Sequence, residues 1–275
     1  MKKKRLFEKH PKRLFTFGCS FTNYMWPTWA DILRYDLDCP HYNFAKSGAG
    51  NQFTSTMVTL ADQHYQFTKD DLVIINWTNI AREDRYTGGW ELPGNIYSQE
   101  LHHKKWVKRW GHQDHYALRD FSYIALVSDY LKTRTNYHMS SMLNLKDVHQ
   151  YKRKRTSVTQ FDKLLKKELL PSFYKILWNG SLKTKLRNNM TMFRHEFDCH
   201  PLPSEHLTYL QKTYDHEFSA NTIKKVYEVD SSLIEFVKSF ETQPNIEEVR
   251  NQIETKYKNT LGVSIDIDAP KDMFY

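Results

Sequence analysis

The 275-residue sequence predicts an α/β fold in which helices cover both faces of a parallel β-sheet. Short β-rich runs alternate with segments of helical spacing through the first half of the chain. One run, residues 72–77, is apolar almost throughout, which is typical of a central strand buried on both faces. Hydrophobic residues make up 40% of the chain and aromatic residues 15%, which is enough apolar surface for a core and argues against a disordered chain.

The first half of the chain is expected to run in the order β-α-β-α-β-loop-α-β. The predicted strands cover residues 13–18, 41–45, 72–77 and 136–142. The predicted helices cover residues 28–35, 52–65 and 118–131, where apolar side chains recur at helical spacing. Residues 79–115 are aromatic and irregular, and we expect a long surface excursion there.

The second half of the chain is more polar and predicts additions to this domain. Residues 146–194 are basic with helical character, and we interpret them as an insertion. A further helix is expected at residues 205–210, and amphipathic segments follow at 223–229, 233–240 and 246–257. The predicted organisation is a basic N-terminal tail (1–12), an α/β domain (13–213) holding the insertion, and a C-terminal helical extension (214–275).

The net charge of +8 is concentrated in part in two basic runs, KKKR at residues 2–5 and KRKR at residues 152–155. A basic surface attracts nucleic acid, anionic lipid or an acidic glycan, and it also keeps a protein in solution. Such short runs are common, so we favour the solubility interpretation, and nucleic acid is the less favoured partner. Oligomeric state cannot be read from these features.

The sequence shows no sign of export or of a membrane span. No apolar segment follows the charged N-terminus, and no stretch approaches the roughly 18 apolar residues that cross a bilayer. Three cysteines (Cys19, Cys39 and Cys199) are too few and odd in number for a disulfide framework. We therefore expect a cytoplasmic protein. The 13 histidines lack carboxylate or cysteine partners at ligand spacing, so no metal or other cofactor is predicted.

Three predicted strands end in residues that could carry chemistry, and ligands of open α/β sheets bind beyond the carboxyl ends of the strands. The first strand leads to Ser20, the second to Gly48 and the third to Asn79. A nucleophilic serine needs a base held by a third group, and His200 with nearby Asp198 suits those roles. The backbone N–H groups of Ser20 and Gly48, with the Asn79 amide, are the candidate donors to an oxyanion.

Substrate-binding candidates follow the third strand. Arg82 could grip a carboxylate or phosphate with two N–H groups, and Trp90 could stack on a sugar face. Trp77, at the end of the strand, joins them as a predicted pocket residue. The alternative is that Arg82, Arg85 and Trp90 lie on an ordinary exposed loop.

The order of these residues resembles the blocks of the SGNH/GDSL hydrolase family. Residues 18–22 (GCSFT) resemble the block around the family's serine, and Gly48 resembles its second block. Residues 77–80 (WTNI) fall at the third block and place Asn79 there, and residues 198–201 (DCHP) resemble the last block. The resemblance implies a flavodoxin-like three-layer α/β/α sandwich. It implies a metal-free serine esterase with Ser20, His200 and Asp198 as triad and Ser20, Gly48 and Asn79 as oxyanion hole.

The sequence departs from the family pattern in several places. Cys19 replaces an aspartate of the first block, and Trp77 and Ile80 replace the glycine and the aspartate of the third block. Asp198 lies two residues before His200 and not three, so Glu196 is an alternative orienting acid.

Each role also has a plainer alternative. Ser20 could cap a helix, Asp198 could be an ordinary loop residue, and His200 could be an exposed loop histidine. His206 falls inside the next predicted helix and is better explained by packing. Cys19 and Cys199 neighbour the proposed triad, and core packing is favoured for both over a thiol nucleophile or a metal pair.

The predicted function is serine-dependent hydrolysis of an acylated carbohydrate or similar small ester. The same site could transfer the acyl group to a sugar hydroxyl, and the sequence leaves both outcomes open. A competing hypothesis is a non-catalytic module that binds nucleic acid or an acidic polymer through residues 151–155. A second competitor is an assembly role for the C-terminal helices.

Overall fold

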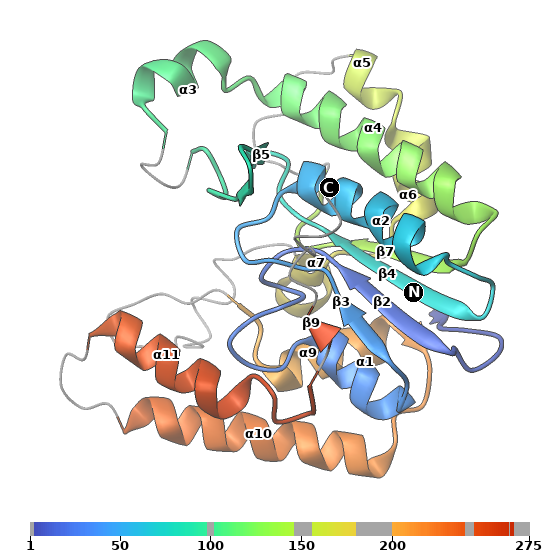
Figure 1. Cartoon of the computed structure of the whole chain (residues 1–275), viewed down its shortest axis with the longest axis vertical. Helices are drawn as coiled ribbons and strands as arrows, with labels where there is room; N and C mark the ends of the chain where they lie inside the picture. Colours follow the sequence, from blue (N-terminus) through green and yellow to red (C-terminus); the bar gives the residue numbers. More distant parts are fainter. Residues whose placement is uncertain are drawn as a thin grey trace.

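A computed structural model describes residues 3–97, 102–145, 156–179, 200–239, 245–263 and 265–266. The protein is a mixed α/β structure around a parallel sheet with strand order β7-β4-β2-β3-β9 (Figure 1). Its strands are β2 (Arg13–Phe17), β3 (His41–Asn43), β4 (Asp71–Trp77), β7 (Asn136–Ser141) and β9 (Ile265–Asp266). All four neighbouring pairs are parallel, which confirms the parallel sheet predicted from the alternating pattern.

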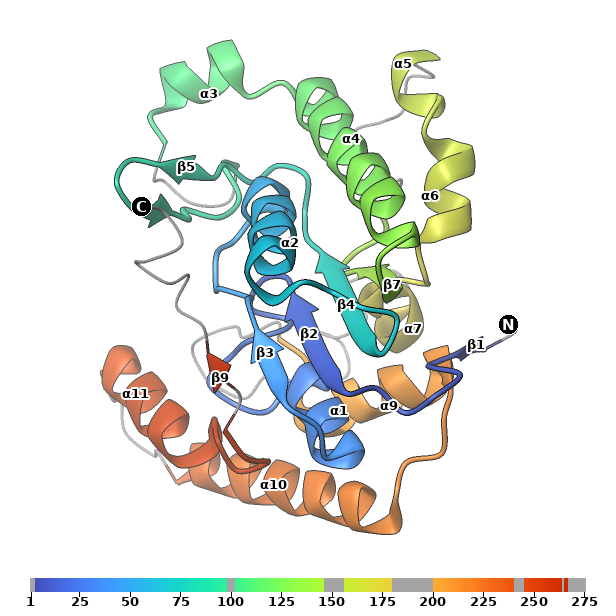
Figure 2. The ribbon, with the colours of Figure 1, turned by 45° about the vertical axis from the view of Figure 1, so that its right-hand side comes forward.

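The centre of the sheet is formed by the two strands with the most apolar sequence. Every residue of β4 is buried, as the run at residues 72–77 predicts, and Leu14 of β2 lies opposite its Leu72. Helices α2 (Asn51–Tyr65) and α4 (Gln113–Lys132) cover one face of the sheet. Helices α1 (Trp29–Leu37) and α9 (Pro203–Thr213) lie on the other face, and α10 (Ala220–Lys238) packs against their outer side (Figure 2).

Local sequence explains where the helices flanking the first strands begin. Thr28 caps α1: its Oγ1 accepts from the Ala30 N–H, and Asp31 accepts from the Thr28 N–H in return. Helix α2 starts one residue before the predicted limit, after Gly50 in extended conformation. The prediction of these helices from apolar spacing is confirmed.

The excursion predicted at residues 79–115 contains short ordered elements. A two-stranded hairpin, β5 (Arg85–Tyr86) with β6 (Trp90–Glu91), is followed by helix α3 (Lys104–Trp110). Within the predicted insertion, residues 156–179 form α5 (Thr156–Thr159), α6 (Asp162–Glu168) and α7 (Phe173–Trp178). The KRKR run lies outside the described residues.

The C-terminal region packs against the α/β domain at several points. Strand β8 (Tyr214–Asp215) pairs with β1 (Lys4–Arg5), which lies in the predicted basic tail. Strand β9 extends the central sheet beside β3. Helix α10 is continuous where the sequence predicted two segments, 223–229 and 233–240. The polar residues 230–232 break the apolar pattern there, but Asp230 accepts from Ser204 N–H and Oγ–H of α9.

Helix α11 (Ile246–Tyr257) matches its predicted limits and rests on α10. A second, smaller core joins the two helices to the loop after β2. Its members are Met25, Trp26, Leu202, Val229, Leu233, Val237, Val249, Ile253 and Tyr257. Among the described residues, no helix has the length and apolar character needed to cross a membrane.

Candidate functional site

Ser20 lies in a tight turn that directly follows the central strand β2. The Cys19 carbonyl accepts from the N–H groups of Thr22 and Asn23, at 2.8 and 3.1 Å, which closes the turn. Gly18 allows the chain to pass the end of β4, since a Cβ atom there would lie 2.9 Å from the Asn76 carbonyl oxygen. Ser20 itself is 7% exposed, so its hydroxyl is held at the edge of the buried core.

His200 meets Ser20 although the two residues are 180 positions apart. The His200 Nε2 atom lies 2.7 Å from Ser20 Oγ, which is hydrogen-bond distance. The Tyr24 ring stacks on the imidazole, with centroids 3.8 Å apart and an interplanar angle of 19°. Trp26 Nε1–H donates to the Pro201 carbonyl at 2.9 Å and fixes the chain after His200. The nucleophile and base predicted from sequence are therefore brought together in the geometry that proton transfer requires.

The predicted orienting acid, Asp198, lies outside the described residues, as do the alternative Glu196 and the neighbouring Cys199. Their roles stay predictions.

A cavity of about 970 Å³ opens over the Ser20–His200 pair. Its lining combines turns at the carboxyl ends of the strands, the excursion after β4, helix α7 and helix α11. The lining residues are Ser20, Phe21, Asn23, Tyr24, Met25, Asn43, Ala45, Lys46, Ser47, Gly48, Arg82, Leu92, Gly94, Asn95, Met142, Tyr174, His200, Glu247, Arg250, Asn251, Glu254 and Lys258. Ser20, His200, Gly48 and Arg82 therefore share one cavity, as expected from the sequence.

Gly48 is held in a conformation that side chains disfavour. Its φ is +82°, and a Cβ atom would lie 2.3 Å from the Leu92 carbonyl oxygen. Glycine at this position thus allows the turn to pass close to the backbone of Leu92. Within the described residues, neither the Gly48 N–H nor the Ser20 N–H donates to a protein group. Both residues line the cavity, so these two amides remain the candidate donors to an oxyanion.

Three other predicted site residues do not line the cavity. Trp77 is fully buried in β4, opposite Ser141 of β7. The Asn79 Oδ1 atom accepts from the Ala81 N–H at 3.0 Å, in the turn that follows the strand. Trp90 packs edge-on against Phe53 of α2, with centroids 5.3 Å apart. Trp77 and Asn79 lie at the end of a strand that is buried on both faces and Trp90 lies in the β5–β6 hairpin, and local sequence does not distinguish such packing from a pocket wall.

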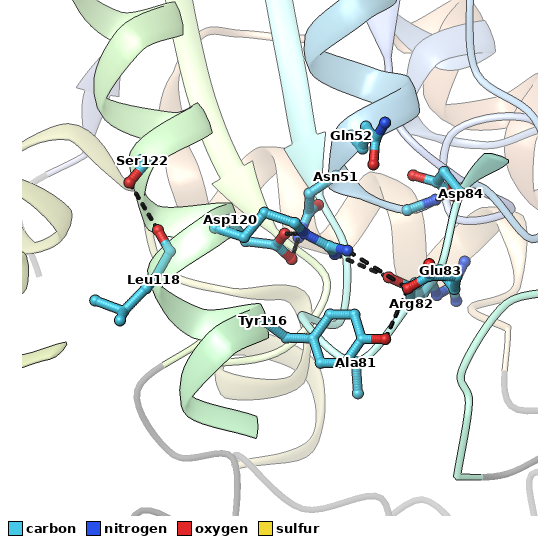
Figure 3. Close-up of polar contacts among 12 residues, drawn as sticks. Asn51, Gln52, Ala81, Arg82, Glu83, Asp84, Tyr116, Leu118, Asp120 and Ser122 are labelled. Atoms are coloured by element: carbon cyan, nitrogen blue, oxygen red, sulfur yellow. Dashed lines mark hydrogen bonds and ion pairs between the residues drawn. The ribbon is translucent and has the colours of Figure 1, made fainter. Parts of the chain in front are cut away.

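A buried polar network supports the turns that carry Gly48 and Arg82 (Figure 3). Asp84, 3% exposed, accepts from Gly50 N–H at 2.7 Å and from Phe53 N–H at 2.9 Å at the start of α2. Arg82 donates to the Ala49 carbonyl at 2.8 Å. Burial raises the Asp84 pKa, while the two backbone N–H groups lower it. Hydrogen bonds from Arg82 and Asp84, in the turn after β4, therefore hold the chain that directly follows Gly48.

The same network continues into helix α4. Asn51 Nδ2–H donates to Asp120 Oδ2 at 2.7 Å, and Arg119 Nε–H donates to Asp120 Oδ1 at 2.6 Å. Arg119 also donates to the Arg82 carbonyl at 2.8 Å. Burial raises the pKa of Asp120 to about 7, against the opposing effect of the Arg119 guanidinium. Sequence reasoning missed this network, because its members look like ordinary helix and loop charges.

Helix α11 is a second element that the sequence did not connect with the site. Polar side chains that recur every three or four positions form a stripe on this helix, and this stripe faces the cavity. Its members are Glu247, Arg250, Asn251, Glu254 and Lys258. The apolar stripe of the same helix, with Ile253 and Tyr257, packs on the smaller core. An amphipathic pattern was visible in the sequence, but nothing in it showed which region the polar side would face.

Other candidates behave as packing residues. Cys19 is fully buried, and His206, 1% exposed, lies in α9 against the Phe173 ring. In the described part of the chain, no group of three or more histidine, cysteine, aspartate or glutamate residues could hold a metal ion.

No protein-family model matches the chain, and no curated protein matches it.

Proposed function

We propose that this protein is a serine-dependent ester hydrolase of the SGNH type, built on a flavodoxin-like three-layer sandwich. The observation that carries the proposal is the 2.7 Å approach of His200 Nε2 to Ser20 Oγ at the base of an open cavity. The parallel sheet supports it, since the serine follows the central strand at the edge where ligands of such sheets bind.

The proposed reaction proceeds in two half-reactions. Ser20 Oγ attacks the ester carbonyl carbon while His200 Nε2 takes the hydroxyl proton, and the backbone N–H groups of Ser20 and Gly48 bind the resulting oxyanion. Collapse of the tetrahedral intermediate breaks the bond to the alcohol oxygen, which leaves with the proton from His200. Water then attacks the acyl-serine by the same route and releases the acid. Asp198 is proposed to accept from His200 Nδ1–H and to stabilise the imidazolium.

The lining of the cavity favours a polar substrate. Its described walls carry amide side chains at Asn23, Asn95 and Asn251 and charged groups at Arg82 and on α11. Apolar and aromatic side chains, among them Phe21, Met25 and Met142, also line the cavity and could contact a short acyl group. An acylated carbohydrate, or a similar small ester, fits this chemistry.

Acyl transfer is the second candidate, and the size of the cavity favours it. At about 970 Å³ the cavity lies at the upper end of the range for small-molecule sites. An acceptor hydroxyl could therefore enter beside the acyl-serine in place of water. Measuring how the acyl group divides between water and an added sugar would separate the two reactions.

The first experiment is labelling of the purified protein with a fluorophosphonate, which reacts with activated serines. We expect labelling of the wild type and loss of at least 100-fold in rate for Ser20→Ala and His200→Ala, because each change removes the activated hydroxyl. Ser47→Ala is the matched control, since Ser47 lines the same cavity and should label normally.

Asp198→Asn tests the third residue of the triad. We expect the rate of labelling to fall by 10-fold or more with thermal unfolding unchanged. Absence of labelling in folded wild-type protein, or labelling that persists in Ser20→Ala, would contradict the proposed function.

A further inference from the structure

Helix α3 carries an unusual concentration of unpaired positive charge. Four of its seven residues are basic: Lys104, Lys105, Lys108 and Arg109. Across the described residues, none of these four forms an ion pair, and the helix contains no acidic residue. Some cations elsewhere have partners, as Lys12 does with Asp70 at 2.7 Å. The positive charge on α3 is therefore not neutralised by an ion pair with any described residue.

Exposed aromatic rings lie beside these cations. Trp110 is 56% exposed, and the Arg109 guanidinium lies 5.0 Å from the centroid of its ring. Tyr97 is 44% exposed, and its hydroxyl donates to the Gly111 carbonyl directly after Trp110. On the neighbouring hairpin, the Arg85 guanidinium lies 5.3 Å over the Trp106 ring. Cations and aromatic rings thus lie together on and beside this helix, and we call this set of residues the α3 surface.

The position of α3 leaves this surface accessible. None of its residues is buried, and the helix stands away from the sheet beyond the β5–β6 hairpin (Figures 1 and 2). Exposing a tryptophan has a cost in water, and nearby like charges repel, so neither feature stabilises the fold. A ligand with negative charges and planar rings would neutralise the cations and cover the exposed tryptophan.

We propose that the α3 surface binds single-stranded nucleic acid. Phosphates would contact Lys104, Lys105, Lys108 and Arg109, and a base would stack on Trp110. The unpaired bases of a single strand present the planar rings that an exposed indole can stack on. Sugar recognition needs acceptors for hydroxyl groups, and α3 has no carboxylate or amide side chain. The proposal does not depend on Ser20, because none of these residues lines the catalytic cavity.

The proposal has a quantitative consequence for salt dependence. Four phosphate contacts on a single strand predict a slope of about −2.8 for log affinity against log salt concentration. Affinity should therefore fall roughly 50-fold between 50 and 200 mM salt.

The test is fluorescence anisotropy of a labelled 20-nucleotide oligo(dT) with the full chain. Lys108→Gln/Arg109→Gln should weaken binding at least 10-fold and reduce the magnitude of the slope by about 1.4, since two contacts are removed. Trp110→Ala should weaken binding about 5-fold or more and leave the slope unchanged, because a stacked base carries no charge. The matched control, Lys224→Gln/Lys225→Gln on α10, removes the same charge and should stay within 2-fold of the wild type.

Competing ligands and Ser20→Ala complete the experiment. Ser20→Ala should bind oligo(dT) normally, so failure of the proposed hydrolase and failure of this surface are distinguishable. Equal losses in the α3 and α10 variants would overturn the proposal, as would no binding at 100 μM protein and 50 mM salt. Tighter binding of heparin or of anionic vesicles than of oligo(dT), with no effect of Trp110→Ala, would overturn it in favour of an acidic polysaccharide or a lipid surface.

Discussion

The two walls of the cavity over the Ser20–His200 pair are built in different ways. The loop wall comprises residues 46–51 and 78–84. It is held by hydrogen bonds to the buried carboxylates of Asp84 and Asp120. The helical wall, α11, is held by apolar contacts of the smaller core, and its polar side chains reach the cavity directly. The loop wall carries the proposed oxyanion donor, and α11 carries charged groups that could select a substrate. Groups that take part in chemistry need fixed positions, whereas groups that recognise a substrate tolerate adjustment.

The largest effect is expected from breaking the loop wall. Asp84→Ala leaves the Gly50 and Phe53 N–H groups buried without an acceptor, so we expect the free energy of unfolding to fall by about 3–5 kcal/mol. Fluorophosphonate labelling should slow at least 10-fold, because Gly48 loses its support. Urea unfolding and labelling below the transition measure the two effects. Glu91→Ala, in the exposed hairpin, is the control, and a similar loss there would contradict the comparison.

The next effect is a dependence of stability on pH. Burial raises the folded-state pKa of Asp120 to about 7, whereas an unfolded aspartate has a pKa near 3.9. The folded state thus binds more protons than the unfolded state in this window, and the contribution of Asp120 to stability falls as pH rises from about 4 to about 7. Between pH 5 and pH 7.5 the loss is about 2–3 kcal/mol.

Asp120→Asn should remove that dependence. Buried histidines act in the opposite direction: burial lowers the pKa of His41 to about 3 and of His138 to about 4, so each stabilises the fold less at acidic pH. The difference between wild type and Asp120→Asn isolates the aspartate. Urea unfolding of both proteins at pH 5 and pH 7.5 measures it, and parallel pH profiles would show that Asp120 does not titrate in this range.

A smaller effect is expected on the helical wall. Arg250→Ala should raise KM about 5-fold for an anionic ester substrate and leave kcat within 2-fold, because Arg250 lines the cavity and has no role in the proposed proton transfer. Steady-state kinetics with the ester that the proposed hydrolase turns over fastest provides the measurement. Lys256→Ala, on the same helix outside the cavity lining, is the matched control. A fall in kcat without a change in KM would place Arg250 in the chemistry.

The smallest effect concerns the ion pair on that wall. Lys258 Nζ lies 3.0 Å from Glu254 Oε1, four positions apart on the surface of the helix. Glu254→Gln should change the free energy of unfolding by less than about 0.5 kcal/mol. Thermal unfolding would check this, and a loss above 1 kcal/mol would show that α11 depends on the pair and not on its apolar core.

The sequence by itself determined the parallel α/β fold, because the apolar run of β4 and the helical spacing around it depend on local patterns. It also selected Ser20, Gly48, Arg82 and His200, all of which line one cavity. Ser20, Gly48 and Arg82 follow the strands β2, β3 and β4, and the carboxyl ends of parallel strands share an edge of the sheet. It did not separate Trp77 and Trp90, which pack in the interior or on α2, from true lining residues.

Only the tertiary structure decided the distance between Ser20 and His200, because a separation of 180 residues is closed by packing and not by local preference. The same holds for the cavity wall formed by α11, the network around Asp120 and the unpaired cations of α3. A charged side chain has the same appearance in a sequence whether it is paired, buried or facing a ligand. Its role is set by the neighbours that the fold brings to it.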